Sequence, residues 1–415
     1  MSLFRRSLTA LAAAALAIGA AVAQQTPPQP MPQPTPVPRP VAPQVPVPPP
    51  PDVDGQSWVL MDYATGQILA SKNPDERRAP ASLTKVMTEY VVAAELAAGR
   101  VHWNDMVTIS QHAWQAGGAG TDGSTSFLKL GSQVALGDLL KGMIVQSGND
   151  AAIALAEHTA GSEQSFASLM NAYAKQLGMT NTHYSDASGY PVDDHYSTAR
   201  DIATLTRALI HNFPKEYAVS KIKEFEWNGI KQQNRVTLLW RDPTVDGVKT
   251  GYTSAAGYCM DASAKRGDER MIAVVMGASS ENARADSAMA LLNYGFRFYE
   301  THKLYEAGKP LATPRLWKGE ADQLPIGVAE DVQVTVKTGE YDKLKATMDI
   351  PSTLVAPFKK GQRVGSLDVT LDGKPLESVP LIALDDAPQG GFFKRLWDSI
   401  LLWFHGDKKK AADAK

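Results

Sequence analysis

The chain has 415 residues, of which 44% are hydrophobic, and its formal net charge at pH 7 is −2. This length and apolar content are enough for a large core and a second domain. The charge balance gives no reason to expect nucleic acid as a partner, because nucleic-acid binders carry a basic surface. A single cysteine, Cys259, excludes an intramolecular disulfide, and its apolar sequence surroundings predict a buried small side chain.

The N-terminus has the pattern of an export signal. Arg5 and Arg6 precede an apolar run from 8 to 22 that ends in small residues, which places a charged region, a short apolar region and a cleavage site in the usual order. The run is too short to span a bilayer comfortably. We expect residues 1–23 to be a signal peptide cleaved after Ala23, with an uncleaved anchor as the alternative.

A proline-rich stretch follows, from 24 to 53. Proline alternating with Gln, Val and Thr favours an extended polyproline conformation without a core. We interpret it as a semi-rigid spacer ahead of the folded body, which begins near Gly55. A docking tract for a proline-binding partner is the other interpretation.

The first folded elements are two short strands and a long helix. The segments 57–62 and 67–70 flank the turn Tyr63-Ala64-Thr65-Gly66 and are predicted to be strands. Apolar side chains then recur at helical spacing, which predicts a helix over 79–99 with proline at its start and glycine past its end. Ser82 and Lys85 fall near the first turn, three residues apart on one face. A hydroxyl and an amine therefore meet at a helix N-terminus as a candidate nucleophilic site.

Helices dominate the middle of the chain. A second helical pattern covers 138–159 and is interrupted by the polar sequence Ser-Gly-Asn-Asp at 147–150. Two further helices are predicted at 166–177 and 198–212. A polar break between two apolar helical segments loses packing. Proteins depart from the expected burial pattern mainly at functional or strained sites. We therefore take 147–150 as a candidate functional segment.

Strands return in the next part of the chain. The apolar runs 258–264 and 271–278 flank a turn and predict a hairpin, and a helix over 285–302 ends this body. Strands at both ends with helices between them predict an α+β fold whose antiparallel sheet is assembled from distant segments. We place this body at 54–306.

A small all-β domain is predicted at 307–387, where the segments 332–336 and 366–371 alternate apolar and polar residues and Asp372-Gly373 forms a turn pair. The final segment, 388–415, carries an amphipathic helix. One half of its helical wheel holds Phe392, Phe393, Leu396, Trp397, Ile400, Leu401, Trp403 and Phe404.

That C-terminal helix is too short to cross a membrane. Thirteen residues, Phe392–Phe404, span about 20 Å as a helix, whereas a bilayer core is about 30 Å thick. The aromatic face predicts a helix lying in a membrane interface, with Lys408, Lys409 and Lys410 near anionic headgroups. A helix packed on its own protein is the alternative.

Ser-x-x-Lys alone is weak evidence, because the pattern starts at Ser82, at Ser126 and at Ser220. Only the first copy lies on a strong helical pattern. Lys-Thr-Gly also occurs twice, at Lys249 and at Lys337, and the second copy lies in the predicted β domain. The order of the motifs is more specific. Within one body the chain has, in turn, Ser82-x-x-Lys85, Ser147-Gly148-Asn149 and Lys249-Thr250-Gly251.

On these three motifs the sequence resembles the penicillin-binding serine acyltransferases, and most of all the low-molecular-mass D-alanyl-D-alanine carboxypeptidases of the peptidase S11 type. The neighbouring sequence at 81–88, 147–152, 246–253 and 292–298 supports the narrower match. The likeness runs from Gly55 to the C-terminus. It implies a penicillin-binding/β-lactamase-like domain with an antiparallel sheet and a helical subdomain. It also implies a small β domain and an amphipathic helix on the periplasmic face of the inner membrane.

The resemblance also implies the catalytic roles. Ser82 would be the nucleophile and Lys85 its general base, once burial and the second cation Lys249 lower its pKa. The Ser147 hydroxyl would relay a proton to the leaving D-alanine. Backbone N–H groups of Ser82 and Tyr252 would form the oxyanion hole, although some relatives have histidine where this chain has Tyr252.

Substrate binding is implied in the same way. Asn149 would bond the acyl-side amide of the peptide, and Lys249 and Thr250 would hold its terminal carboxylate. Gly251 would keep the strand edge open for the peptide. Arg284 matches a family arginine near that pocket, and a structural ion pair is its other interpretation. His195 is placed near the site by the likeness alone and receives no catalytic role.

The implied substrate is a peptidoglycan stem pentapeptide ending in D-Ala-D-Ala, with β-lactams as inhibitors. We expect no cofactor and no metal ion, since the eight histidines lack His-x-x-x-His spacing. Three alternatives stay open: a D,D-endopeptidase using the same residues, a β-lactamase, and a non-catalytic membrane-held wall-binding protein. A β-lactamase needs a second base, and no convincing Glu-x-x-x-Asn loop lies between Ser147 and Lys249.

Overall fold

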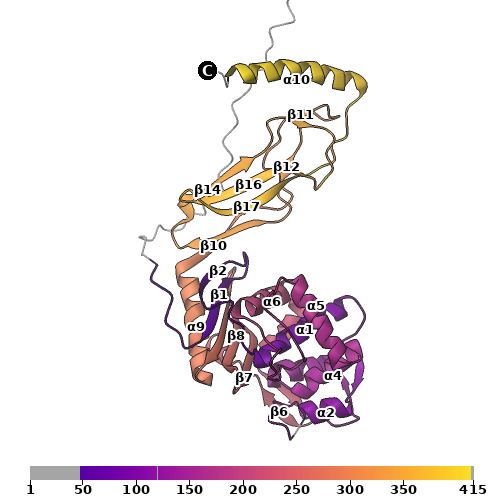
Figure 1. Ribbon diagram of the computed structural model, residues 1–415, viewed down its shortest axis with the longest axis vertical. Coiled ribbons are helices and arrows are strands. Elements are labelled where there is room, and N and C mark those ends of the chain that lie inside the picture. The colour runs from indigo at the N-terminus through magenta and orange to yellow at the C-terminus, as the bar shows by residue number, and fades with distance from the viewer. Residues whose placement is uncertain (1–46, 119, 413–415) are drawn as a thin grey trace, which may run out of the picture. The chain divides into compact units, whose positions relative to one another are not determined.

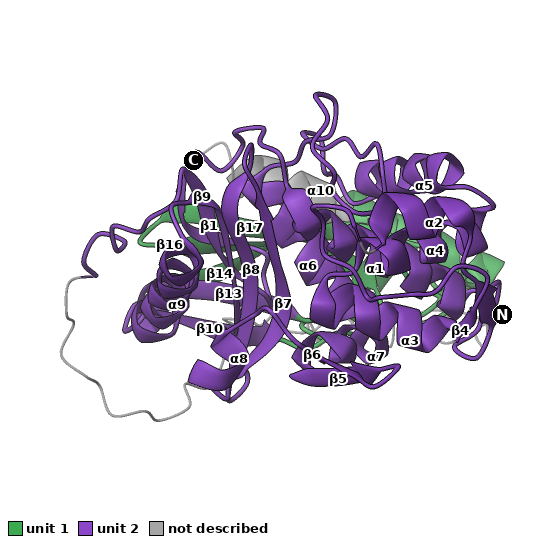
Figure 2. Cartoon of the chain, turned by 90° about the horizontal axis from the view of Figure 1, so that it is seen from below, with its two compact units in different colours: residues 1–39, 305–331, 345–415 green, residues 40–304, 332–344 purple. Residues whose placement is uncertain are grey.

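The computed structural model describes residues 47–118 and 120–412. The predicted signal peptide and most of the predicted spacer therefore lie outside the described residues. The chain divides into two compact units (Figure 2). The larger unit contains the described residues up to 304 together with 332–344, and the smaller unit contains 305–331 and the residues from 345 onward.

A five-stranded antiparallel sheet forms the centre of the larger unit (Figure 1), with the strand order β2–β1–β9–β8–β7. Its strands are β1 (Ser57–Asp62), β2 (Ile68–Lys72), β7 (Val245–Thr253), β8 (Gly257–Arg266) and β9 (Glu269–Ala278). The strand β1 pairs with β9, with Ser57 opposite Met276. Segments far apart in sequence thus share one sheet, as predicted.

Side chains alternate between the two faces of this sheet, as the period of a strand requires. In β1, Val59 and Met61 join the apolar cluster on the helical face, whereas Trp58 and Leu60 join a second cluster with helix α9 (Glu281–Phe298). Because both faces are covered, every residue of β1 is buried. A strand covered on both faces has a nearly continuous apolar sequence.

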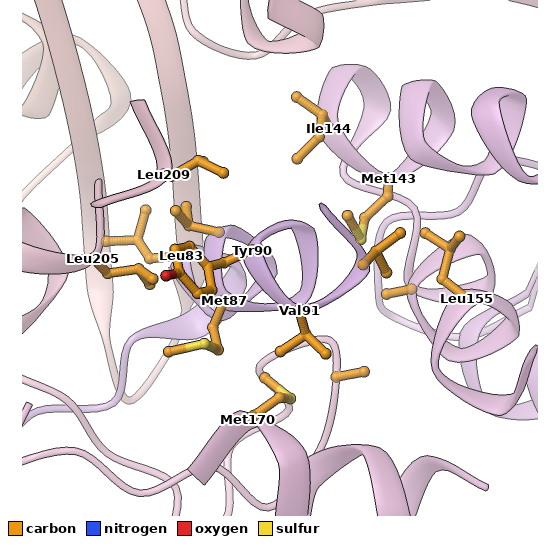
Figure 3. Packing of buried hydrophobic residues seen from close by; sticks show 14 of the residues in the cluster. Leu83, Met87, Tyr90, Val91, Met143, Ile144, Leu155, Met170, Leu205 and Leu209 are labelled. Atoms are coloured by element: carbon orange, nitrogen blue, oxygen red, sulfur yellow. The ribbon is translucent and has the colours of Figure 1, made fainter. Parts of the chain in front are cut away.

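Helix α1 (Thr84–Ala97) is the centre of the helical face (Figure 3), and the 3-10 turn Ala81–Leu83 precedes it. Its Met87 and Val91 lie among apolar side chains of neighbouring helices. These neighbours are α3 (Leu136–Lys141), α4 (Asn149–Ala160), α5 (Glu163–Gln176) and α6 (Ala199–Asn212). Each fully buried side chain of this size contributes about 1.5–3 kcal/mol, so packing fixes the residues at the start of α1.

Several short elements of the larger unit escape prediction, because three to seven residues are too few to show a clear period. They are β3 (Met106–Thr108), β4 (Gln133–Ala135), β5 (Glu224–Trp227), β6 (Ile230–Gln233), α2 (Gln111–Gly117), α7 (Pro214–Tyr217) and α8 (Leu238–Arg241).

The predicted end of the last helix in this unit is wrong. The prediction extends it to 302, whereas α9 ends at Phe298 and the chain continues as β10 (Tyr299–Tyr305). This strand pairs with β13 (Val332–Lys337). Pairing with a distant segment overrides the local helical pattern, which carries no information about that partner.

The smaller unit contains a four-stranded sheet in the order β12–β17–β16–β14 and a parallel pair, β11–β15. Its strands are β11 (Leu316–Trp317), β12 (Ile326–Gly327), β14 (Leu344–Asp349), β15 (Leu354–Val355), β16 (Arg363–Leu371) and β17 (Lys374–Ala383). The predicted turn pair joins β16 to β17, and Asp372 and Gly373 both have positive φ, 50° and 77°. That conformation is typical of a tight hairpin turn.

Helix α10 (Phe392–Ala412) contacts the smaller unit through its polar residues. The Lys318 backbone N–H donates to the Asp398 carboxylate at 2.6 Å, and Arg395 donates to the Gln389 side chain at 3.1 Å. Lys394 pairs with Asp322. These contacts fix the rotation of the helix about its own axis.

The apolar face of α10 is exposed. Six side chains are between 43% and 84% exposed: Phe392, Phe393, Leu396, Trp397, Ile400 and Trp403. Surface helices of globular proteins normally bury their apolar face, so this helix has the reverse orientation. Across the described ranges, no helix has both the length and the apolar content to cross a membrane.

Candidate active site

Ser82 lies in the 3-10 turn at the N-terminal end of α1. The preceding residue, Ala81, is buried and has a positive φ of 49°. Non-glycine residues seldom adopt this conformation, and it persists where surrounding packing enforces it, often at active sites. The strained turn places the Ser82 hydroxyl at the positive end of the α1 dipole.

Lys85 is fully buried and its amine has three close oxygen neighbours. Its Nζ lies 3.0 Å from Oγ of Ser82, 2.7 Å from Oδ1 of Asn149 and 2.8 Å from the carbonyl oxygen of Ser188. The structure thus brings the predicted nucleophile and base together. It also adds two acceptors to the amine, and the sequence motifs predict neither of these contacts.

The environment of Lys85 favours the neutral amine. Burial lowers its pKa to about 7, although the carboxylates of Asp186 and Asp150 raise it, and the charge of Arg235 lowers it further. An amine with a pKa near the working pH can accept a proton from a serine hydroxyl. Lys85 therefore meets both requirements of a general base, reach and protonation state.

A π-helical turn, Gly142–Gln146, separates α3 from α4 and ends at Ser147. Ser147 is 2% exposed and has a left-handed φ of 69°. π turns and left-handed non-glycine residues concentrate at functional sites, which agrees with the predicted functional segment. The bonds of Lys85 to described residues do not include the Ser147 hydroxyl, so the proton-relay role remains a prediction.

Asn149 begins α4, and its backbone N–H donates to the Ser124 carbonyl at 2.8 Å. The next residue, Asp150, is fully buried and accepts backbone N–H bonds from Ser126 at 2.8 Å and from Leu128 at 3.0 Å. These bonds hold the preceding loop against the start of α4. Because Oδ1 of Asn149 bonds Lys85, its amide nitrogen is the group left for a substrate carbonyl.

Lys249 and Thr250 are almost fully buried on β7, the edge strand of the sheet. Nζ of Lys249 donates to the Thr250 carbonyl at 3.2 Å. Burial lowers the pKa of Lys249 well below its ordinary value, and the positive charge of Lys85 lowers it further. The charge of one buried amine thus disfavours the charged form of the other.

Gly251 lies where β7 passes Ser82. A Cβ atom at this position would lie 3.0 Å from the Pro80 carbonyl oxygen and 3.2 Å from the Ser82 nitrogen. Glycine therefore allows a close approach of the strand to the nucleophile. Close packing against Ser82 is thus a second reason for glycine at this position. The first is the predicted need for an open strand edge where the peptide binds.

Arg284 reaches the same strand from α9. Its Nη1 donates to the Gly251 carbonyl at 3.0 Å, and its guanidinium lies 5.6 Å from the ring centre of Tyr258. Tyr252, which is 54% exposed, stacks on Tyr258 with ring centres 4.3 Å apart. Arg284 thus supports β7 beside the predicted oxyanion donor, and its contact with substrate remains a prediction.

Arg235 belongs to none of the sequence motifs, yet it acts on the site. It is exposed, and its positive charge lowers the pKa of Lys85, Lys249 and Arg284. An exposed guanidinium whose charge reaches this cluster suits a carboxylate ligand. The sequence offered no spacing signal for it, because Arg235 comes close only through the fold.

The other two Ser-x-x-Lys copies do not form a similar pair. Ser126 and Ser220 are buried, whereas Lys129 and Lys223 are exposed. The lysine in each copy therefore lies away from its serine. Only the pattern at Ser82 brings hydroxyl and amine together.

Cys259 is buried on β8, as predicted, and burial raises the pKa of its thiol. Among the residues that the structure describes, no three His, Cys, Asp or Glu side chains gather as a metal site requires.

Comparison with known proteins identifies the family. Residues 44–280 match the peptidase S11 family, described as D-alanyl-D-alanine carboxypeptidase. The chain belongs to this family. Residues 299–389 match the family described as penicillin-binding protein 5, C-terminal domain.

Close relatives cover most of the chain. D-alanyl-D-alanine carboxypeptidase DacC of Escherichia coli (strain K12) is 48% identical over 356 residues, which are 85% of this chain and 89% of DacC. DacA of the same strain is 44% identical over 356 residues, 85% of this chain and 88% of DacA. Penicillin binding protein 5 from Haemophilus influenzae has a TM-score of 0.79 at 42% identity, covering 82% of this chain and 99% of that one. The predicted family, fold class and enzyme class are confirmed.

Proposed function

We propose that this serine D-alanyl-D-alanine carboxypeptidase removes the terminal D-alanine from peptidoglycan stem pentapeptides through an acyl-enzyme on Ser82. The observation that carries the proposal is the buried Lys85 amine, with a pKa lowered to about 7, 3.0 Å from the Ser82 hydroxyl. A serine hydroxyl is a weak nucleophile at neutral pH and needs such a base.

The acylation step then uses the groups in order. Lys85 takes the proton of Ser82 as Oγ attacks the carbonyl carbon of the D-Ala-D-Ala bond. The backbone N–H groups of Ser82 and Tyr252 stabilise the oxyanion, a contribution of about 3–4 kcal/mol for one such donor. Ser147 passes a proton to the leaving D-alanine amine. Water then attacks the ester on Ser82, and Lys85 is again the base in this hydrolysis step.

Substrate binding uses the strand and the start of α4. The amide nitrogen of Asn149 bonds the acyl-side carbonyl of the peptide, and the peptide pairs with the edge of β7 near Gly251. Lys249 and Thr250 bind the terminal carboxylate, and Arg284 contributes positive charge. Arg235 is exposed and its charge lowers the pKa of Lys249, so it adds a second guanidinium for that carboxylate.

The proposed location is the periplasm, at the outer face of the inner membrane. The aromatic face of α10 within Phe392–Phe404 would lie in the membrane interface. Two observations support this: polar contacts hold the helix to its unit, and its apolar side chains are exposed. The proposed limits of the domains remain 54–306 for catalysis, 307–387 for the β domain and 388–415 for the tail.

The first test is mass spectrometry of the protein after reaction with penicillin. We expect the adduct on Ser82, and we expect Lys85→Ala to abolish labelling. Lys223→Ala is the matched control, because that lysine belongs to another Ser-x-x-Lys copy and is exposed, so it should label as the wild type does. An adduct on Ser126 or Ser220, or rapid labelling of Lys85→Ala, would overturn the assignment.

A further inference from the structure

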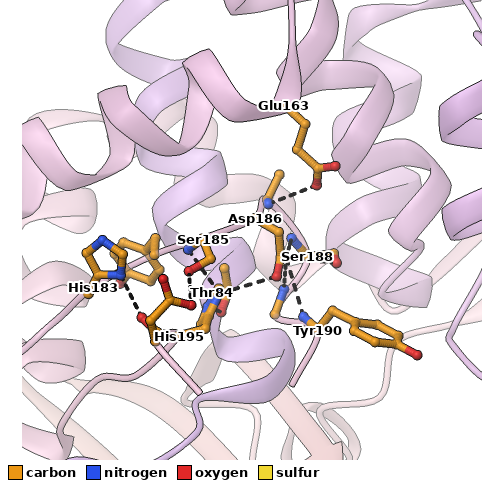
Figure 4. Close-up of polar contacts among 12 residues, drawn as sticks. Thr84, Glu163, His183, Ser185, Asp186, Ser188, Tyr190 and His195 are labelled. Atoms are coloured by element: carbon orange, nitrogen blue, oxygen red, sulfur yellow. Dashed lines mark hydrogen bonds and ion pairs between the residues drawn. The ribbon is translucent and has the colours of Figure 1, made fainter. Parts of the chain in front are cut away.

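The segment from 185 to 195, called here the Asp186 loop, lies against the first two turns of α1 (Figure 4). Three residues of α1 bond to it: Thr84 approaches His195 at 2.8 Å, Lys85 donates to the Ser188 carbonyl at 2.8 Å, and Thr88 donates to the Ala187 carbonyl at 2.6 Å. Lys85, the threonine before it and a threonine one turn later on α1 are therefore held by one loop.

The Asp186 carboxylate organises this loop from within. Its Oδ1 accepts backbone N–H bonds from Ser188 and Gly189, both at 2.7 Å, and the Ser188 hydroxyl at 3.0 Å. Burial alone would raise the pKa of Asp186, but His195 and these N–H donors lower it to about 2. The carboxylate is therefore ionised at neutral pH, and its bonds fix the backbone that carries the Ser188 carbonyl.

His195 joins this carboxylate to α1. Its side chain is 1% exposed, with Nδ1 3.3 Å from Oδ2 of Asp186 and Nε2 2.8 Å from Oγ1 of Thr84. The Ser185 backbone N–H also lies 3.2 Å from Nδ1. A buried imidazole with partners on both nitrogens has a fixed ring orientation. Asp186, His195 and Thr84 thus form a continuous polar chain that ends beside Lys85.

Close packing leaves this loop little freedom. Gly189 has a φ of +91°, and a Cβ there would lie 1.9 Å from the Ala81 carbonyl oxygen and 2.8 Å from Oγ1 of Thr84. The loop backbone therefore touches the residue before the nucleophile. On its other side, the Ala187 N–H donates to Glu163 of α5 at 3.1 Å.

The chemistry of Lys85 shows what this rigidity achieves. A neutral amine has two N–H bonds and one lone pair. The Asn149 and Ser188 oxygens can only accept, so they take the two N–H bonds. The lone pair is then left for the Ser82 hydroxyl, 3.0 Å away. Moving the Ser188 carbonyl would release one N–H bond and turn the lone pair away from the proton that it must accept.

We propose that Asp186 and His195 are positioning residues for the general base: their buried chain to Thr84 holds the Ser188 carbonyl and the first turn of α1 so that the Lys85 lone pair faces Ser82. This inference rests on the proposed function. Neither residue touches the substrate; both act through Ser188 and Thr84.

The charges around Lys85 give a readout that a merely structural role would not move. Besides burial, the amine is faced by the carboxylates of Asp186 and Asp150 and by the cations Arg235 and Lys249. Asp186→Asn keeps an oxygen for the loop N–H groups and removes one negative charge. The pKa of Lys85 should then fall, and the acid limb of the acylation profile should move to lower pH.

The experiment measures D-alanine release and fluorescent-penicillin acylation from pH 5 to 9 in the full-length protein. For His195→Gln and Asp186→Asn we expect kcat to fall about tenfold or more with KM nearly unchanged, and Asp186→Asn to shift the acid limb downward. His102→Gln is the matched control: this histidine is exposed, pairs with Asp105 at 3.5 Å rather than with the Asp186 loop, and should leave both rates unchanged.

A second pair of variants keeps the test decisive if those two fold poorly. Thr84→Val removes the hydroxyl that meets His195 and should lower kcat, whereas Thr84→Ser retains it and should restore the rate. Wild-type rates in His195→Gln or Thr84→Val overturn the inference. So does an unmoved acid limb in a folded Asp186→Asn. If the wild type carries penicillin on another serine, the proposed function itself fails, which mass spectrometry distinguishes.

Discussion

At the scale of single residues, the site depends on buried groups whose charge the fold controls. Lys85 and Lys249 are buried amines with lowered pKa values. Glu89, one turn after Lys85 on α1, is 1% exposed, and neither of its carboxyl oxygens has a hydrogen-bond partner in the described chain. An isolated buried carboxyl is destabilising when ionised, so this residue allows a test of the electrostatics.

Glu89→Gln should stabilise the protein at alkaline pH. Burial raises the pKa of Glu89 to about 8, and Glu216 raises it further against the opposing charge of Lys249. Between about pH 4.5 and 8 the unfolded chain has released this proton while the folded chain retains it, so stability falls as pH rises through that window. The variant lacks this loss and should exceed the wild type at pH 8 by up to a few kcal/mol.

Thermal or denaturant unfolding at pH 5 and pH 8 measures this difference. Glu95→Gln, on the same helix, is the matched control: Glu95 accepts from Arg100 at 2.7 Å, so its replacement should give no gain at pH 8. Equal stability differences for Glu89→Gln at the two pH values would contradict the prediction.

At the scale of elements, sequence periodicity predicted the helices and strands whose buried residues recur at regular spacing. It did not predict the features that depend on single contacts between distant residues. The limits of β1, 57–62, were predictable because both faces of the strand are apolar. The break at 147–150 was predictable as polar, but the π turn and the left-handed Ser147 were not. Neither was the bond from Lys85 to Asn149, nor the approach of Arg235, since both depend on distant segments that meet in the fold.

The contact between β7 and the 3-10 turn that precedes α1 supplies the element-scale prediction. Gly251→Ala should lower kcat/KM about tenfold or more with little loss of stability, because the new methyl group would push β7 away from the Ser82 nitrogen, 3.2 Å from the added Cβ. Penicillin acylation rates and the unfolding midpoint measure the two effects separately.

Gly295→Ala is the matched control, because an added Cβ there meets its nearest atom at a similar distance. There the nearest atom to an added Cβ is the flexible Met271 side chain, 3.1 Å away, and the site lies in the α9 cluster rather than beside Ser82. Its kinetics should equal those of the wild type. Normal acylation by Gly251→Ala would show that the strand tolerates displacement and that this close approach is dispensable.

At the scale of the whole molecule, the chain divides its tasks between two units. The larger unit holds every proposed catalytic group, and the smaller unit holds α10. The Asp398 carboxylate is 5% exposed and accepts the Lys318 N–H at 2.6 Å, so this unit determines which face of the helix is outward. The outward face is the apolar one, and an exposed apolar patch of this kind marks an interaction site.

The last prediction concerns the binding of α10 to a lipid membrane. Phe393→Ser combined with Trp397→Ser should lower binding to vesicles of phosphatidylglycerol and phosphatidylethanolamine by about tenfold or more, because each aromatic ring removed from the interface contributes on the order of 1.5–3 kcal/mol when buried. These side chains are 84% and 62% exposed, so their loss removes little packing within the protein. Vesicle sedimentation measures binding, and D-alanine release from a soluble peptide should be unchanged.

Trp240→Ser provides the control, since Trp240 is 46% exposed and lies on α8 of the larger unit. Its loss should leave vesicle binding as in the wild type. Asp398→Ala tests the orientation of the helix: without the bond to Lys318, α10 can turn its aromatic face inward, and binding should weaken although every aromatic residue remains. If the aromatic double variant binds vesicles as tightly as the wild type, α10 is not the membrane contact.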